Sequence, residues 1–444
     1  MLPTFFFVTS FLHQISLVQG SQSHLSQRFS KSNHSVAQNV EIVNVTFKMF
    51  LTDKHSVEYN IHSLEDIDKL QKAIAAYQEN LEVIIKQNLK HSITLYLRRN
   101  SLVIAKGFVR KHFTSAGKPI IEKSDSKDKQ LASCLYTGKL LGNEDSLVSF
   151  NLCNGINGVV EIPEKSIQLE SVIQGSIVIH RWIEASSTER GQQLNCGTKA
   201  VNKRIPSLHS IRHHRRLPRE LKLPAGHNSS TKYIELYVVM DNSMYRRSGD
   251  LDKTTMRAIN MVNYASALYR QLNMYLVLVG VEVWNDRNKI SYQLANNSRD
   301  EYDPDKLLAE FNKYRLHYFG RETPNDSGQL FTNVDFEGGT LGKGSTGSIC
   351  TQANSGGVTY DQNANNYIRA ATTMAHELGH NLLMRHSNAQ DTYMGKDCEC
   401  EYPDDPDFKK CIMHSSSSRK YYRWLLPYEW TISKFLFLKV TKLS

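Results

Sequence analysis

The residues with the clearest capacity for chemistry are His376, Glu377 and His380, followed six positions later by His386. Residues 367–383 are predicted to form a helix, so the first two histidines project from one face about one turn apart. Two imidazoles at this spacing can bind one Zn²⁺, and His386 can act as a third ligand while a fourth position stays open. Glu377 can serve as general base and then general acid in a hydrolytic reaction. The pattern predicts a catalytic zinc site.

The third histidine sets a condition on the helix. Because His386 lies six residues beyond His380, the helix must end near residues 382–384 so that the chain can turn back toward the metal. A bare His-Glu-x-x-His pattern is short, and an exposed helix with fortuitous charges is the alternative interpretation. The added histidine disfavours that alternative.

Length and composition limit the architecture that carries this site. The chain has 444 residues, which allows two or three compact units, and its 40% hydrophobic content can supply their cores. The 54 Lys and Arg against 44 Asp and Glu give a formal charge of +10, but the basic residues are dispersed apart from a cluster at 212–216. A solvated exterior is the favoured interpretation over an anionic binding surface, and no nucleic-acid partner is predicted.

The first twenty residues carry an apolar stretch, interrupted by His13 and Gln14, and end in the small residue Gly20. This is typical of a secretory signal peptide, although a first core strand is the alternative. No later apolar run reaches the roughly 18 residues needed to cross a bilayer, so we expect a secreted chain without a transmembrane anchor. Five Asn-x-Ser/Thr sequons fit a secreted glycoprotein, and they begin at Asn33, Asn44, Asn228, Asn296 and Asn325.

The region from about residue 40 to 200 is predicted to be mainly β. Its short alternating apolar runs, such as 93–97 and 146–150, indicate half-buried strands, and one amphipathic helix is expected around 64–88. A basic, proline-containing stretch at 203–224 is interpreted as a linker. Within it Arg212, Arg215 and Arg216 form an Arg-x-x-Arg site for a proprotein convertase, with a solvated basic loop as the alternative.

Strands and helices alternate beyond the linker. Residues 233–240 and 275–283 are predicted to be strands, and apolar residues recur at helical spacing between 256 and 269. Pro304 occupies the first position of a further predicted helix. This order indicates an α/β domain.

Seven cysteines in an oxidising compartment should mostly pair, and the odd number leaves at least one with another role. They are Cys134, Cys153, Cys196, Cys350, Cys398, Cys400 and Cys411.

These motifs carry a resemblance to a known family. Residues 376–386 resemble the HExxHxxGxxH signature of the metzincins, and Cys411-Ile412-Met413 resembles their Met-turn, in which Met413 lies under the zinc. Residues 233–241, 329–336 and 347–358 are similar to the reprolysin branch, the ADAM and snake-venom metalloproteinases. The resemblance covers about residues 40–413. It implies an α/β metzincin protease domain, with a mixed and mostly parallel sheet and an active-site helix, preceded by a mainly β prodomain.

The same resemblance implies roles for other residues. Cys196 matches the cysteine switch of a zymogen, whose thiolate occupies the open zinc position, although an unpartnered structural thiol is the alternative. Disulfides are expected between Cys134 and Cys153 and between Cys400 and Cys411, whereas the family's partners of Cys350 and Cys398 do not occur in this sequence. Glu235 and Asp326 match two ligands of an incomplete Ca²⁺ site. Matrix metalloproteases are the nearest rival family, but their prodomains lack the Cys134 and Cys153 pair.

The sequence departs from the family in three places. Leu383 replaces a glycine, at a cost of roughly 1–2 kcal/mol if the backbone there is left-handed. Glycines and polar residues within 340–347 weaken the expected edge strand for substrate. Residues 425–444 match nothing in the family, which suggests a truncated natural form, an alternative transcript or a gene-model error.

We therefore predict five segments: a signal peptide at 1–20, a prodomain at 21–202, a linker at 203–224, a metalloprotease domain at 225–424 and an atypical tail at 425–444. The predicted function is that of a secreted zinc metalloendopeptidase zymogen that cleaves extracellular matrix or cell-surface proteins. The alternative is a catalytically weak or inactive ADAM-like form that acts by protein binding.

Overall fold

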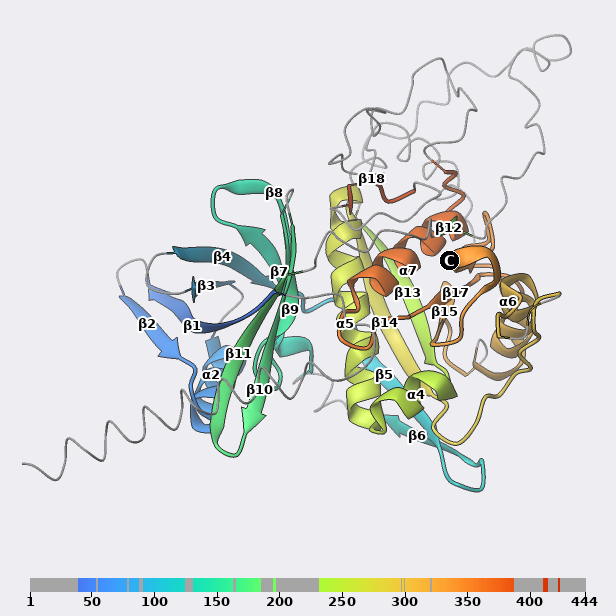
Figure 1. The fold of residues 1–444 in the computed structure, drawn as a ribbon, viewed down its shortest axis with the longest axis horizontal. Helices are drawn as coiled ribbons and strands as arrows, with labels where there is room; N and C mark the ends of the chain where they lie inside the picture. Colours follow the sequence, from blue (N-terminus) through green and yellow to red (C-terminus); the bar gives the residue numbers. More distant parts are fainter. Residues whose placement is uncertain are drawn as a thin grey trace, which may run out of the picture.

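The chain is described by a computed structural model, in which two β-sheets dominate (Figure 1). The described residues are 39–52, 55–77, 80–87, 91–123, 131–162, 165–184, 195–196, 231–296, 298, 300–319, 322–386, 410–413 and 422–423. The predicted signal peptide, linker and C-terminal tail lie outside these residues.

The first sheet is built from the N-terminal part of the chain. Its strand order is β11-β10-β9-β8-β7-β4-β3-β1-β2, and an additional pairing of β11 with β1 closes it into a barrel. The first five residues of β1 pair with β11, and residues further along pair with β2 and β3. The strands are β1 (Asn39–Thr52), β2 (His55–Asn60), β3 (Asn80–Gln87), β4 (His91–Arg99), β7 (Leu135–Leu140), β8 (Asn143–Asn151), β9 (Asn157–Glu161), β10 (Ser166–Gln174) and β11 (Ile177–Glu184).

The barrel encloses its own hydrophobic core. Alternate residues of the strands point inward, as the two-residue period of a half-buried strand requires. Phe47, Val83, Phe150 and Trp182 are buried in this core, and helix α2 (Leu64–Tyr77) packs Ile67, Leu70 and Ile74 against it.

The expected helix at 64–88 was correct only in its first part. The chain leaves the helix after Tyr77 and forms β3, because Leu81, Val83 and Ile85 alternate with more exposed neighbours. The strands expected at 93–97 and 146–150 are confirmed as β4 and β8.

The second sheet has the order β12-β16-β17-β15-β13-β14-β5-β6. Strand β13 pairs in parallel with β14 and β15, β15 pairs in parallel with β17, and β16 runs antiparallel to β17. The strands are β13 (Lys232–Met240), β14 (Met274–Val283), β15 (Ser327–Thr332), β16 (Thr340–Gly344), β17 (Gly356–Tyr360), β12 (Asn195–Cys196), β5 (Ile104–Phe113) and β6 (Pro119–Lys123). A separate parallel pair joins β18 (Lys410–Cys411) to β19 (Tyr422–Arg423).

Helices cover both faces of this sheet, and the strand β13 shows why. Its residues Leu236 and Val238 face one core together with α5 and α7, whereas Tyr237 and Val239 face a second core together with α6. The helices are α4 (Asn242–Ser248), α5 (Leu251–Tyr269), α6 (Pro304–Tyr314) and α7 (Ile368–Asn381). Short single turns follow at Arg270–Leu272, Arg315–Phe319 and Glu337–Gly339. This mixed α/β layer bears out the predicted strands and helices of the second region.

The strands at both edges of the second sheet come from the part of the chain before residue 203: β5 and β6 at one edge and β12 at the other. Strand β5 leaves the barrel after β4 and pairs in parallel with β14, while β6 folds back on β5 (Figure 1). At the opposite edge, β12 pairs with β16. The region expected to form a separate N-terminal domain therefore contributes strands to both edges of the second sheet.

Among the described residues, no helix is both long enough and apolar enough to cross a membrane.

Candidate metal centre

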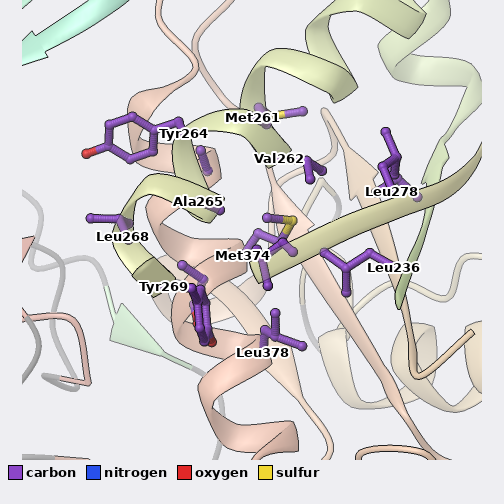
Figure 2. Close-up of a cluster of buried hydrophobic side chains, with 14 of the residues drawn as sticks. Leu236, Met261, Val262, Tyr264, Ala265, Leu268, Tyr269, Leu278, Met374 and Leu378 are labelled. Carbon is purple, nitrogen blue, oxygen red and sulfur yellow. The ribbon is translucent and has the colours of Figure 1, made fainter. Parts of the chain in front are cut away.

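Helix α7 carries the two histidines and is fixed firmly in the core. Met374 and Leu378 project from it toward α5 and the sheet, where they meet Tyr269, Leu236 and Leu278 (Figure 2). The Tyr269 hydroxyl also donates a hydrogen bond to the Ala375 carbonyl at 2.8 Å. The face of the helix that carries Thr373 and Glu377 lies against strand β16.

Three histidine nitrogens converge at the end of this helix. The Nε2 atoms of His376 and His380 are 3.1 Å apart, and those of His380 and His386 are 3.2 Å apart. Nitrogen ligands about 2.0–2.1 Å from a tetrahedral Zn²⁺ lie roughly 3.3 Å from one another, so the spacing fits this ion.

The outer ring nitrogens determine which atoms face inward. His376 Nδ1 lies 2.6 Å from the Ile412 carbonyl, and His380 Nδ1 lies 2.8 Å from the Met384 carbonyl. A carbonyl accepts only, so both rings donate through Nδ1 and turn unprotonated Nε2 lone pairs inward. Lone pairs this close together repel unless a cation lies between them. The donor set therefore fits a zinc ion.

Electrostatics also favours metal binding over protonation at His380. Burial, followed by the neighbouring His386, lowers the pKa of His380 to about 3. Its imidazole is therefore neutral at physiological pH, which is the form that binds a metal.

Cys196 supplies a fourth donor atom. Its sulfur lies 3.5 Å from His380 Nε2, and the four donor atoms of Cys196, His376, His380 and His386 all lie within 4.8 Å of one another. The residue is held there by the short strand β12, where Asn195 is opposite Thr340 and Cys196 is opposite Gly342 in a parallel pairing with β16.

Glu377 is fully buried beside this cluster. The Cys196 thiol donates to its Oε1 at 3.4 Å. The carboxylate therefore lies next to the position of the fourth donor without belonging to the group of metal-binding atoms.

Strand β16 forms despite its glycines, contrary to the weakening expected from them. A Cβ at Gly342 would lie 2.6 Å from Thr373 Cγ2, and one at Gly344 would lie 2.5 Å from the Glu377 carbonyl. The glycines let the strand approach helix α7 closely, which places its edge beside Glu377. Lys343 is buried between them and pairs with Asp305 of α6 at 2.5 Å.

The turn toward His386 requires the left-handed conformation expected for a glycine. Helix α7 ends at Asn381, and Leu383 has φ = 69°. The turn is closed by hydrogen bonds from Leu383 N to the His380 carbonyl at 2.8 Å and from Met384 N to the Gly379 carbonyl at 2.9 Å. The chain still brings His386 to the other two histidines, although a non-glycine residue in this conformation costs about 1–2 kcal/mol.

Gly347 lies against the substituted residue. It donates its backbone N–H to the His380 carbonyl at 2.8 Å, and a Cβ at this position would lie 2.8 Å from Leu383 Cδ1. The loop after β16 therefore has space for the Leu383 side chain, because the residue that contacts it, Gly347, has no side chain.

Met413 lies beneath the histidines. It is fully buried, and a Cβ at Gly379 would lie 2.5 Å from its sulfur. The adjacent Ile412 carbonyl orients His376. The segment predicted as a Met-turn thus supports the helix and fixes one imidazole.

Sequence reasoning did not identify Asn381 as a positioning residue. Its side chain is fully buried and donates to the Ser345 carbonyl at 2.9 Å and the Gly356 carbonyl at 3.1 Å, while it accepts from Ser327 Oγ at 2.8 Å. The available signal was an amide at the last position of the helix, directly after the second histidine. It ties the histidine helix to three strand termini.

The remaining predicted residues lie away from the histidines. Cys134 and Cys153 form a disulfide with their Cα atoms 5.1 Å apart. Asp326 accepts the Glu235 backbone N–H at 2.9 Å, and burial followed by the Asp326 charge raises the pKa of Glu235. The Cys350 thiol donates to Asp326 at 3.1 Å, and burial raises its pKa to about 12. Cys350 forms no disulfide with another cysteine in the described part of the chain.

Several predicted residues lie outside the described part of the chain. These are Arg212, Arg215 and Arg216 of the processing site, and Cys398 and Cys400. Cys411 is described only as part of the backbone of β18. The expected Cys400–Cys411 disulfide therefore stays a prediction.

Comparison with known proteins identifies the region around the metal centre. The model of the reprolysin (M12B) family of zinc metalloproteases matches residues 232–423. Over 332 residues the chain is 32% identical to disintegrin and metalloproteinase domain-containing protein 12 of Mus musculus, covering 73% of this chain and 34% of that protein. Over 340 residues it is 29% identical to snake venom metalloproteinase-disintegrin-like mocarhagin of Naja mossambica, covering 75% and 50%.

The chain thus spans about a third of one relative and half of the other. The α/β sheet with its histidine-bearing helix has the metzincin fold that the family match implies. Residues 232–423 therefore form a domain of the reprolysin family of zinc metalloproteases.

Proposed function

We propose that this chain is a secreted zinc metalloendopeptidase zymogen that cleaves peptide bonds in extracellular matrix or cell-surface proteins. The observation that carries the proposal is the convergence of three histidine nitrogens and the Cys196 sulfur within 4.8 Å, beside the buried Glu377. Three histidines with one exchangeable donor are the ligand set of a catalytic rather than a structural zinc site.

His376, His380 and His386 would hold the ion. When bound, zinc supplies Lewis acidity that polarises a peptide carbonyl and acidifies water. Glu377 accepts a proton from the attacking water and then donates it to the leaving nitrogen. A substrate in extended conformation would bind along the β16 edge, because backbone N–H and C=O groups there can pair with an added strand.

Latency rests on Cys196. Its sulfur lies among the histidine nitrogens and beside Glu377, and β12 pairs with part of the β16 edge. A thiolate binds zinc more tightly than water does. Activation would then require a cut between β12 and β13, and we propose the Arg212–Arg216 segment as the site for a proprotein convertase.

A Ca²⁺ site at Glu235 and Asp326 is a subsidiary proposal. Asp326 accepts the Glu235 backbone N–H at 2.9 Å, so two carboxylate-bearing residues are adjacent, and carboxylate oxygens suit Ca²⁺. Isothermal titration with Ca²⁺ before and after an Asp326→Asn change tests it. Binding that the change does not alter would refute the assignment.

The alternative function, protein binding without efficient cleavage, is favoured by one specific observation. Leu383 holds a left-handed backbone conformation immediately before the third ligand. Strain at this turn can displace His386 and reduce activity while leaving the surface intact.

The test compares variants of a chain that carries a recognition sequence for a site-specific protease within residues 203–224. After cleavage, in a Cys196→Ser background, hydrolysis of casein and short fluorogenic peptides is measured beside zinc content. Glu377→Gln should lower the turnover by about 10²–10⁴-fold without loss of zinc. Glu337→Gln, a change at an exposed glutamate, is the matched control.

Equal turnover in the Glu377→Gln variant would reject the proposed mechanism. A zinc-loaded reference protein without any turnover would instead support the protein-binding alternative.

A further inference from the structure

The hairpin of β5 and β6 is the second attachment of the N-terminal region to the protease sheet. It lies at the β14 edge, and in the strand order five strands separate it from β12 with Cys196 (Figure 1). Gly280, Val281 and Glu282 of β14 are opposite Val109, Arg110 and Lys111 of β5 in a parallel pairing. The hairpin therefore covers the open edge of the protease sheet with its own backbone.

A buried ion pair joins the two partners at this edge. Lys111 Nζ lies 3.4 Å from Glu282 Oε2, and their side chains are 8% and 0% exposed. Three neutral donors from the protease side also contact this carboxylate: the Tyr237 hydroxyl at 3.2 Å, Trp284 Nε1 at 2.8 Å and the Tyr314 hydroxyl at 2.5 Å. Within the described residues, Lys111 is the only cation that pairs with Glu282.

Two residues further along the strand, Phe113 adds an apolar anchor. Its ring is buried in the core that contains Tyr237 and Trp284, and Lys289 Nζ lies 3.6 Å from its centroid. The Asn285 side chain donates to the Phe113 carbonyl and accepts the Phe113 N–H, both at 2.7 Å. The protease side thus contacts the backbone of the hairpin, the charge of Lys111 and the ring of Phe113.

We propose that the β14 edge, with Glu282 and Asn285, is a binding site for a β-hairpin that presents Lys111 and Phe113, and that this site retains the N-terminal region after the chain is cut. The retention does not depend on Cys196. The proposal rests on the proposed cleavage between residues 203 and 224. Its occupant is the chain's own β5–β6 hairpin, held non-covalently once the connection is broken.

Release of the hairpin would leave a buried charge and a sheet edge of the protease part without partners, and this should retain the N-terminal region. Glu282 would keep its neutral donors but lose Lys111, the one cation that pairs with it among the described residues, and a buried carboxylate without a counter-charge is strongly unfavourable. The N–H and C=O groups of the β14 edge would lose their strand partner at the same time. Both costs oppose release, whatever the state of the metal centre.

The experiment uses the full chain with the inserted protease site, cut in solution. The fraction of N-terminal fragment that co-elutes with the protease fragment is measured by size-exclusion chromatography over a dilution series. This readout requires neither catalytic activity nor cleavage by a natural convertase, so failure of the proposed function does not alter it.

Four variants separate the contributions. Cys196→Ser should leave co-elution unchanged. Lys111→Met should raise the dissociation constant by roughly a hundred-fold, because removal of one partner leaves a buried charge unpaired. Lys106→Met, a change of an exposed lysine in the same strand, is the matched control and should have no effect. Glu282→Gln added to Lys111→Met should restore much of the binding, because no buried charge then lacks a partner.

If the Lys111→Met protein does not fold, the Asn285→Ala variant tests the same site in the same measurement. It removes two hydrogen bonds to the hairpin from the protease side and should weaken retention roughly tenfold. Release of the fragment by Cys196→Ser alone would overturn the proposal. Wild-type retention in both the Lys111→Met and the Asn285→Ala proteins would overturn it as well.

Discussion

The barrel and the protease sheet differ in how the backbone groups at their sheet edges are paired. Eight strands of the barrel form a ring, because β11 pairs with both β10 and β1. The five protease strands from β16 to β14 form an open sheet instead, and each of its edges pairs with a strand from the N-terminal region. A closed sheet satisfies its own backbone, whereas an open sheet needs a partner at each edge.

Because of this difference, separation of the two parts should affect the barrel less than the protease sheet. The barrel has a complete core and a staple at Cys134 and Cys153. The protease sheet loses backbone pairing at both edges when the N-terminal region leaves, and one of those edges passes beside Glu377, the proposed general base. An open edge is thus both a stability cost and the place where a substrate strand can bind.

The largest effect should come from removing the hairpin that covers the β14 edge. We expect replacement of residues 104–123 by a short flexible linker to lower the melting temperature of the protease part by at least about 10 °C, because the sheet loses an edge strand and a buried aromatic anchor. The barrel transition should change little. Differential scanning calorimetry separates the two transitions, and an equal loss in both would contradict the comparison.

A second prediction concerns the pH dependence of the barrel's stability, to which two buried groups contribute in opposite directions. Burial raises the pKa of Glu161 to about 7 and lowers the pKa of His180 to about 4. Glu161 gains its proton more readily in the folded state, so its contribution to stability grows as pH falls from about 7 to its unfolded value of 4.5. His180 resists protonation, so its contribution is lost as pH falls from 6.5 to about 4.

The two effects oppose each other, and Glu161→Gln should expose the histidine alone. We expect the barrel's free energy of unfolding in that variant to fall by about 3 kcal/mol as pH drops from 6.5 to 4, measured by urea denaturation. The double change Glu161→Gln and His180→Gln should abolish this slope. A Glu161→Gln protein as insensitive to pH as the wild type would refute the assignment.

The smallest effect concerns the turn beside the open edge. Leu383→Gly should raise the free energy of unfolding by about 1 kcal/mol, because glycine adopts the observed positive φ without strain. Gly347→Ala should be destabilising in the wild type and less so in the Leu383→Gly background, because its Cβ would then lack the Leu383 contact. Thermal unfolding of all four proteins gives the coupling, and a coupling of zero would show that the two positions act independently.

Much of the metal centre was predictable from sequence. The spacing of His376 and His380 on a helix fixes their common face, and the helix had to end before His386 could reach them. The helix does end at Asn381, and the strands at 233–240 and 275–283 were predictable from runs in which nearly every residue is apolar. Such local features can be predicted from the sequence because the spacing of apolar residues indicates which positions of a helix or strand are buried.

Other features required the tertiary structure. No local pattern indicates that residues 104–123 leave one sheet for another, because a strand's alternation is the same whichever neighbour it pairs with. The role of Gly347 opposite Leu383, and of Asn381 in tying the helix end to the strands, also depends on residues distant in sequence. The sequence by itself determined the candidate metal-binding residues and the local elements. Only the fold decided which part of the chain covers each sheet edge, since backbone pairing between distant segments leaves no periodic signal.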